Sequence, residues 1–222
     1  MTLLDLIGLF RDEAKDQKKP SLWSDSVLVR YAAEGEAEVA RRTRCFFDAT
    51  TPAICSYPIV TPVAVVTLDP RVLFIRRVKL ASQPWTLDKC DQRDLDWGTP
   101  GWEQMQASAP CTWFPLGYRQ MQLVPAPDAN DTLNLQVIRL PLVPLAIDNL
   151  DASPEIEDRA QHGLVHWMLY RAYGKQDSQT SDPAKAKTAL AQFEMQFGPP
   201  STFKDELWLQ HFHGQDQYEG IF

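Results

Sequence analysis

The sequence predicts an α+β protein in which helices at the two ends of the chain flank a strand-rich middle. Three observations lead to this fold class. Apolar residues recur at helical spacing at both ends, the middle alternates apolar and polar residues as strands do, and twelve of the 17 prolines lie in residues 46–147. The chain has 222 residues, 44% of them hydrophobic, which is enough to bury a globular core.

Two helices are expected before residue 46. The first covers residues 3–17 and has five apolar residues on one face: Leu3, Leu6, Ile7, Phe10 and Ala14. Pro20 ends this segment, because proline cannot continue a helix. The second begins at Ser24 or Asp25, both good N-caps, and runs to Arg44. Basic side chains at its end meet the negative pole of the helix dipole.

The middle of the chain is predicted to be a sheet. Four stretches between the prolines are typical of strands, namely residues 62–68, 71–80, 118–125 and 132–141. Asp69-Pro70 and Asn130-Asp131 favour turns between them. We therefore expect an antiparallel sheet that closes into a small sandwich or barrel.

Two more helices are expected after residue 148. Ser153 is placed to cap the first, with Pro154 in its first turn, and Gly174 ends it. The second begins at Asp182-Pro183 and ends at Gly198. Each of the four helices has one apolar face and none is long enough to stand alone.

The sequence therefore predicts a discontinuous four-helix bundle formed by residues 1–45 and 148–200, with residues 46–147 as an inserted β domain. An insertion of this size is tolerated because the entropy of loop closure grows only logarithmically with length.

Residues 201–222 form a separate C-terminal arm, extended or helical, after a double proline. The arm is rich in aromatic residues: Phe203, Trp208, Phe212, Tyr218 and Phe222. Such a segment either orders on a partner protein or folds back on its own domain as a last helix, and the sequence leaves both interpretations open.

The charge distribution argues against a nucleic-acid reader. The net charge is −7, and residues 148–222 carry twelve acidic but six basic side chains. The chain therefore has no broad basic surface for binding phosphates. It also has no apolar window of the roughly 18 residues that a membrane helix needs, and its start lacks the basic region of a signal peptide. We expect a protein made in the cytosol, with Cys45, Cys55, Cys90 and Cys111 as free thiols.

The sequence gives only weak evidence for a catalytic or metal-binding site. His162 and His166 share a helix face at the spacing of a zinc protease, but the glutamate that would follow the first histidine is missing. His211 and His213 have no acidic neighbours that would suggest a metal site. The aspartates Asp88, Asp91, Asp94 and Asp96 do not fit the EF-hand pattern, so a solvated turn is favoured. We therefore expect no catalytic residue, no metal and no cofactor.

Several stretches together resemble the head–tail connector (adaptor) proteins of tailed bacteriophages. They are LWSDSVLVRYAAEGEAEVARR near the N-terminus, DLDWGTPGW and LVPAPDANDTLNLQVIRLPL in the middle, and SPEIEDRAQHGLVHWMLYRAYGKQD followed by KAKTALAQFEMQFG. No single motif carries the resemblance, which rests on their order over residues 3–198. In that family the two helical halves pack into one bundle and the strands form an inserted domain.

The resemblance implies a non-enzymatic virion protein. It would form a dodecameric ring between the portal and the tail, at the neck of the virion. Genomic DNA would pass through the ring and make non-specific contact with it. Its partners would be further copies of itself, the portal protein and a tail or nozzle protein, with no membrane involved. The resemblance also makes the five arm aromatics candidate portal-binding residues. The alternatives are another neck or tail-completion protein, a host-side protein-binding module, or a metal-dependent hydrolase that uses His162, His166 and an unidentified acid.

Overall fold

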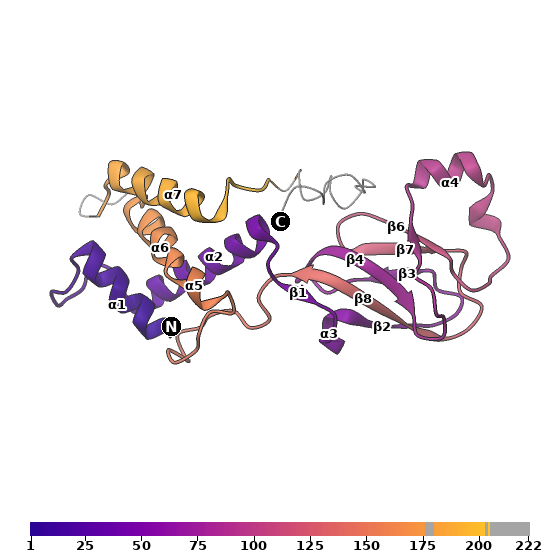
Figure 1. Ribbon diagram of the computed structural model, residues 1–222, viewed down its shortest axis with the longest axis horizontal. Helices are drawn as coiled ribbons and strands as arrows, with labels where there is room; N and C mark the ends of the chain where they lie inside the picture. The colour runs from indigo at the N-terminus through magenta and orange to yellow at the C-terminus, as the bar shows by residue number, and fades with distance from the viewer. Residues whose placement is uncertain (176–179, 203, 205–222) are drawn as a thin grey trace. The chain divides into compact units, whose positions relative to one another are not determined.

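A computed structural model describes residues 1–175, 180–202 and 204 of the chain (Figure 1). The described residues fall into two compact units. Residues 1–46 and 140–200 form a helical unit, and residues 47–139 form a β unit. The α+β class predicted from the sequence is therefore confirmed.

The helical unit is built from α1 (Leu3–Ala14), α2 (Asp25–Thr43), α5 (Asp158–Gln161), α6 (Gly163–Tyr173) and α7 (Pro183–Phe197). Thr2 and Asp5 form a reciprocal capping box at the start of α1. The predicted apolar face of α1 is buried, since Leu3, Leu6 and Phe10 are fully inaccessible to solvent. These residues join a single hydrophobic core to which α2, α6 and α7 also contribute.

Trp23 lies at the centre of this core, in the loop between α1 and α2. Its ring packs edge-on against Phe10 of α1 at 5.4 Å and against Tyr173 of α6 at 5.7 Å. Offset and edge-on aromatic pairs add stability beyond the area that they bury. Trp23 therefore joins the N-terminal helices to a helix that lies far away in the sequence.

The predicted start of the third helix is wrong. Residues 154–157 are not helical, and α5 begins only at Asp158. The cause is a buried carboxylate on α2, because Glu36 accepts a hydrogen bond from the backbone N–H of Glu155. The predicted start of α7 is confirmed. Asp182 caps this helix by accepting a hydrogen bond from the N–H of Lys185, and Pro183 is in its first turn.

Sheet A of the β unit is built around one long strand, β8 (Asp131–Arg139). One side of β8 pairs with β4 (Val72–Leu80). The other side pairs first with β1 (Phe47–Asp48) and then with β2 (Ser56–Ile59), both antiparallel. The short helix α3 (Pro52–Cys55) separates β1 from β2.

Sheet B has the strand order β3-β7-β6-β5. Its members are β3 (Val65–Thr67), β7 (Gln120–Val124), β6 (Thr112–Pro115) and β5 (Asp88–Lys89). The prediction of purely antiparallel pairing is wrong at one edge, because β5 runs parallel to β6. A crossover of more than twenty residues joins these two strands, which is long enough for a parallel connection.

The crossover between β5 and β6 carries α4 (Gln92–Gly98) and the 3₁₀ helix η1 (Trp102–Gln104). The ammonium group of Lys89 on β5 lies 5.9 Å from the ring centroids of both Phe74 in sheet A and Trp113 in sheet B. The two sheets therefore meet around this side chain.

Candidate functional site

The first surface that suggests function is the α4 knob, which we define as residues 91–98. In Figure 1, α4 stands away from the strands of the β unit, and none of its residues is buried. The side chain of Asp91 caps its start by accepting a hydrogen bond from the N–H of Arg93. Trp97 is 91% exposed. A helix that contributes nothing to a core but displays a tryptophan is typical of a protein-binding surface.

The α4 knob is nevertheless fixed to the sheet beneath it. The indole N–H of Trp102 in η1 donates a hydrogen bond of 2.8 Å to the carboxylate of Asp96. The same Trp102 ring packs edge-on against Phe114 of β6 at 5.5 Å. Trp97 is therefore presented on an anchored helix, which lowers the entropic cost of burying it against a partner.

The second surface is an apolar groove between β2 and β3, which we call the β2–β3 groove. It has a volume of about 310 Å³ and is lined by Tyr57, Pro58, Ile59, Val60, Val63, Val65, Val66 and Thr67. Val60 and Val63 are more than half exposed. No charged side chain occurs over the twenty residues 49–68, which include the whole groove.

Both strands that border the groove are edge strands. The carbonyl of Ala64 accepts a hydrogen bond from the N–H of Leu123 in β7, and the N–H of Leu68 donates to the carbonyl of Arg119, just before β7. The backbone groups of Val65 and Thr67 therefore face the opposite, outer side. Proteins commonly protect such edges with charged side chains, as β4 does with the exposed Arg76 and Arg77. The β3 edge has no such protection, which favours an interface.

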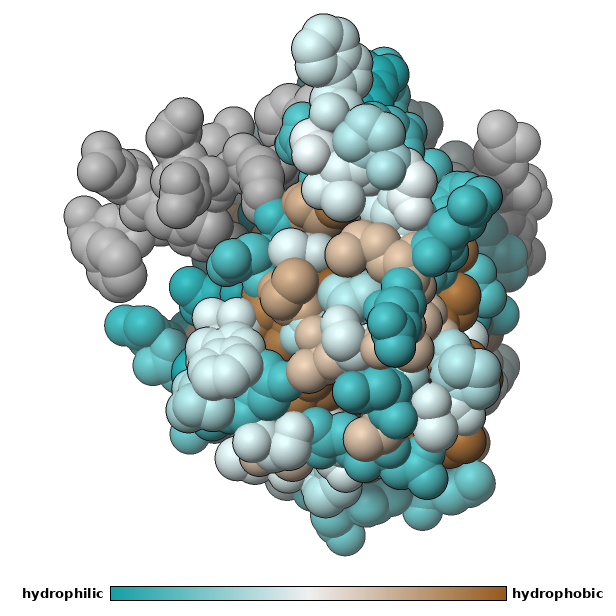
Figure 2. Space-filling view, turned by 90° about the vertical axis from the view of Figure 1, so that its right-hand side faces the viewer, coloured by the Kyte–Doolittle hydropathy of each residue, from teal (hydrophilic) through white to brown (hydrophobic). Residues whose placement is uncertain are grey.

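Figure 2 views the end of the β unit from which α4 projects. Apolar residues gather near the centre of this face, with hydrophilic residues around them. An apolar centre with a polar rim is the usual composition of a protein–protein interface. Sequence reasoning missed both the knob and the groove. The uncharged run of residues 49–68 and the tryptophan in DLDWG were the available signals.

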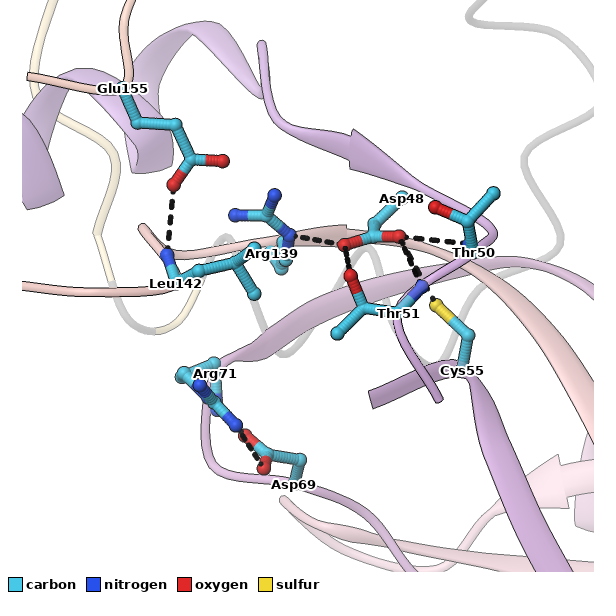
Figure 3. Close-up of polar contacts among 9 residues, drawn as sticks. All are labelled: Asp48, Thr50, Thr51, Cys55, Asp69, Arg71, Arg139, Leu142 and Glu155. Atoms are coloured by element: carbon cyan, nitrogen blue, oxygen red, sulfur yellow. Dashed lines mark hydrogen bonds and ion pairs between the residues drawn. The ribbon is translucent and has the colours of Figure 1, made fainter. Parts of the chain in front are cut away.

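A buried ion pair lies where the chain enters and leaves the β unit (Figure 3). Asp48, at the end of β1, and Arg139, at the end of β8, are 5% and 6% exposed. The Asp48 carboxylate accepts a hydrogen bond of 2.6 Å from Arg139 Nε and one of 2.7 Å from the Thr51 hydroxyl. It also accepts hydrogen bonds of 3.0 Å from the N–H groups of Thr50 and Thr51. We call this arrangement the Asp48 clamp.

The hydrogen bonds of the Asp48 clamp keep the carboxylate ionised. Burial alone would raise the pKa of Asp48, but the donors of Thr50, Thr51 and Arg139 outweigh it and hold the pKa well below its usual value. The Cys55 thiol donates to the same carboxylate at 3.6 Å. Burial, and then the negative charge of Asp48, raise the pKa of Cys55 to about 11, so this thiol is unreactive. The clamp is therefore structural.

A second buried carboxylate holds the helical unit together. Glu36 of α2 is 1% exposed and accepts a hydrogen bond from the N–H of Glu155. Burial raises the pKa of Glu36 to about 7, and the charge of Glu155 adds to the effect, although the backbone donors of Glu155 and Ile156 oppose it. The Glu155 carboxylate in turn accepts a hydrogen bond of 2.8 Å from the N–H of Leu142 (Figure 3).

The structure does not assemble the candidate chemical sites into a metal centre. Nowhere among the described residues do three or more His, Cys, Asp or Glu side chains converge as metal ligands would. His162 and His166 pack edge-on at 5.9 Å, and His162 lies 3.9 Å from Glu13. Burial lowers the pKa of His166, and its Nδ1 is buried without a hydrogen-bond partner among the described residues.

The four aspartates of residues 88–96 are spread over β5 and the α4 knob. Asp88 begins β5, Asp91 caps α4, and Asp94 and Asp96 lie within α4. The expected solvated turn is thus a short helix. The four cysteines are free thiols, and Cys45 and Cys111 are exposed.

The predicted portal-binding residues Phe203, Trp208, Phe212, Tyr218 and Phe222 lie outside the described residues, as do His211 and His213. Among the helices that the structure describes, none combines the length and apolarity required to cross a membrane.

Comparison with known proteins gives a single assignment. A search of curated proteins finds no match. The family model of the SU10 adaptor protein matches residues 1–205, which is nearly the whole chain and includes both units. The resemblance to phage adaptor proteins is thereby confirmed, and with it a structural role as a component of the virion. The chain belongs to the SU10 adaptor protein family.

Proposed function

We propose that this protein is a head–tail connector that forms a ring between the portal and the tail of a bacteriophage, at the neck of the virion. The ring is dodecameric, and the genomic DNA passes through it. One observation carries the proposal: a member of an adaptor family exposes apolar surface on both the α4 knob and the β2–β3 groove. A copy in a ring contacts two neighbours and needs a separate surface for each.

The two units have different roles in this proposal. The helices before residue 46 and after residue 148 act as one discontinuous bundle, and the two sheets act as one inserted sandwich. The net negative charge of −7 suits a channel for DNA, because repulsion keeps the polyanion from binding to the wall. The same charge makes sequence-specific DNA binding an unsuitable role.

The arm, residues 201–222, is the proposed contact with the portal protein. Its aromatic residues Phe203, Trp208, Phe212, Tyr218 and Phe222 are of the type that dominates binding energy at interfaces. The arm also carries four acidic side chains and one basic side chain, so the portal site should be apolar with basic residues around it.

Deletion of the arm tests the portal contact. We expect a chain that ends at Pro200 to keep the circular dichroism spectrum and melting temperature of the bundle but to lose co-purification with portal. A variant with only Trp208 and Phe212 replaced by serine keeps the arm length and serves as the matched comparison. Unchanged portal binding by the truncated chain would contradict the proposed role of the arm.

Electron microscopy of purified virions tests the ring itself. We expect a ring of this protein directly beneath the portal, with the tail or nozzle protein on its other side. Density elsewhere in the neck or tail would instead identify a tail-completion protein. Absence of the chain from virions, by mass spectrometry, would exclude both structural roles.

A further inference from the structure

We propose that neighbouring copies in the ring are joined by the Trp97 side chain of one copy, which inserts into the β2–β3 groove of the next. This inference rests on the proposed function, because it needs copies that stand side by side. It names the two surfaces that meet and the residue at the centre of the contact.

The placement of the two surfaces in one β unit supports a head-to-tail contact. Sheet B has the order β3-β7-β6-β5, so the groove borders one edge and the α4 knob follows the strand at the opposite edge. Strands lie about 4.8 Å apart, which separates these edges by about 14 Å before the loops are added. A copy therefore presents the knob on one side and the groove on the other. Unlike surfaces on opposite sides generate rings when the rotation closes.

The chemistry of the knob matches that of the groove. A tryptophan removes about 150–250 Å² of surface from water when it is buried. Trp97 is 91% exposed, so nearly all of this area is available for a contact. The groove is large enough for an indole ring, at about 310 Å³, and its lining residues are apolar except for Tyr57 and Thr67. Because residues 49–68 carry no charged side chain, burial of the groove would not remove any charged group from water.

Charges at the rim agree with the same docking. Asp94 lies on the α4 knob beside Trp97 and is exposed. Arg119 is also exposed, and its carbonyl accepts a hydrogen bond of 2.8 Å from the N–H of Leu68, the residue that follows the groove residue Thr67. When the knob enters the groove, an acid and a base of different copies can meet at the solvated edge of the contact. Such rim pairs contribute orientation more than affinity.

A second copy is a better occupant than a foreign strand. An unprotected β edge can also accept an extended segment of another protein. However, such an occupant would leave Trp97 exposed, and it would leave the knob on the opposite edge unexplained. A second copy covers both surfaces with one contact, repeated around the ring.

Cross-linking in assembled particles tests the contact. The background variant carries Cys45→Ser and Cys111→Ser, which remove the two exposed thiols. Asp94→Cys and Arg119→Cys are then introduced together in this background. These positions leave Trp97 and the groove intact. After treatment with a bismaleimide, we expect a ladder from dimers to ring-sized multimers on a denaturing gel. Each single-cysteine variant should stay monomeric.

Trp97→Ala and Val63→Asp provide a second readout. Each should cause loss of ring density in purified particles while the melting temperature of the protein is kept. Trp85→Ala is the matched control, because Trp85 is 56% exposed but belongs to neither surface, and it should leave the ring in place.

The outcomes separate this inference from the proposed function. A ladder only in the double-cysteine variant, with loss of the ring in Trp97→Ala, supports the contact. The contact is overturned, and the ring is not, if a normal ring forms but gives no ladder. The same conclusion follows if a single-cysteine variant gives dimers, or if Trp97→Ala assembles normally. Wild-type particles without a ring of this protein overturn both.

Discussion

Arg139 donates a hydrogen bond of 2.6 Å from its Nε to the carboxylate of Asp48, and this pair joins the last residue of the β unit to its first strand. The two residues are 91 positions apart. Asp48 is opposite Val137 in the register, so the pair closes the ladder between β1 and β8. The β unit therefore begins and ends at one fixed point, and its residues lie between the two sequence segments of the helical unit.

We expect Asp48→Asn to destabilise the β unit strongly. The substitution keeps the size of the side chain but removes the negative charge that faces a buried guanidinium group. Loss of one partner of a buried ion pair costs about 3–5 kcal/mol. Chemical denaturation, followed by tryptophan fluorescence, measures the change in the free energy of unfolding.

Asp69→Asn is the matched control for this substitution. Asp69 pairs with Arg71 at 2.9 Å in the same unit, but the side chain of Arg71 is 34% exposed (Figure 3). A pair in contact with water contributes about 1 kcal/mol or less. Equal losses of stability for the two variants would mean that the Asp48 clamp has no special role.

Glu36→Gln should remove a pH dependence from the stability of the helical unit. Burial raises the pKa of Glu36 to about 7, so the folded state binds its proton more tightly than the unfolded state. The resulting stabilisation is fully present below the unfolded pKa of about 4.5 and is lost as the pH rises through about 7. A shift of this size corresponds to about 3 kcal/mol at most. Glutamine keeps the acceptor oxygen for the N–H of Glu155 but does not titrate.

The measurement is the free energy of unfolding at pH 5 and at pH 8. The wild-type protein should be less stable at pH 8, and Glu36→Gln should reduce the difference between the two values. Glu194→Gln, on α7, controls for removal of a carboxylate from the same unit. If Glu194→Gln reduces the difference between pH 5 and pH 8 as much as Glu36→Gln does, the pH dependence does not come from Glu36.

The sequence predicted the elements whose signals are local. The apolar stripe located α1, although this helix ends at Ala14 with Lys15 as a left-handed cap and not at the predicted residue 17. The Asp182-Pro183 signal located α7 correctly. The stretches predicted as strands correspond to β3, β4, β7 and β8. The other four strands were missed, because β2 and β6 have four residues each and β1 and β5 have two, which is too short for a clear periodicity. The cap at Ser153 was misjudged because a distant side chain, Glu36, holds the N–H of Glu155.

The candidate site was harder to predict because exposure is a property of the fold. Trp97 belongs to a segment rich in aspartate, and nothing in that segment shows that its helix packs against no core. The groove needs β2 and β3 side by side, and these strands belong to different sheets. The Asp48 clamp depends on a partner 91 residues away, a separation at which no spacing rule applies.

Gly35→Ala should destabilise the packing of α2 on α6. A Cβ atom at Gly35 would lie 2.9 Å from Cδ1 of Trp167, which is closer than atoms can pack. Trp167 itself packs against Tyr170 and Phe193, so it cannot move freely. Overpacking of this kind costs about 1–3 kcal/mol. Gly8→Ala is the control, since a Cβ atom there meets no other atom within 4 Å, and alanine should stabilise α1 by up to about 1 kcal/mol. Thermal denaturation of both variants measures the difference, and a stabilising Gly35→Ala would show that α2 and α6 pack less closely than the structure has them.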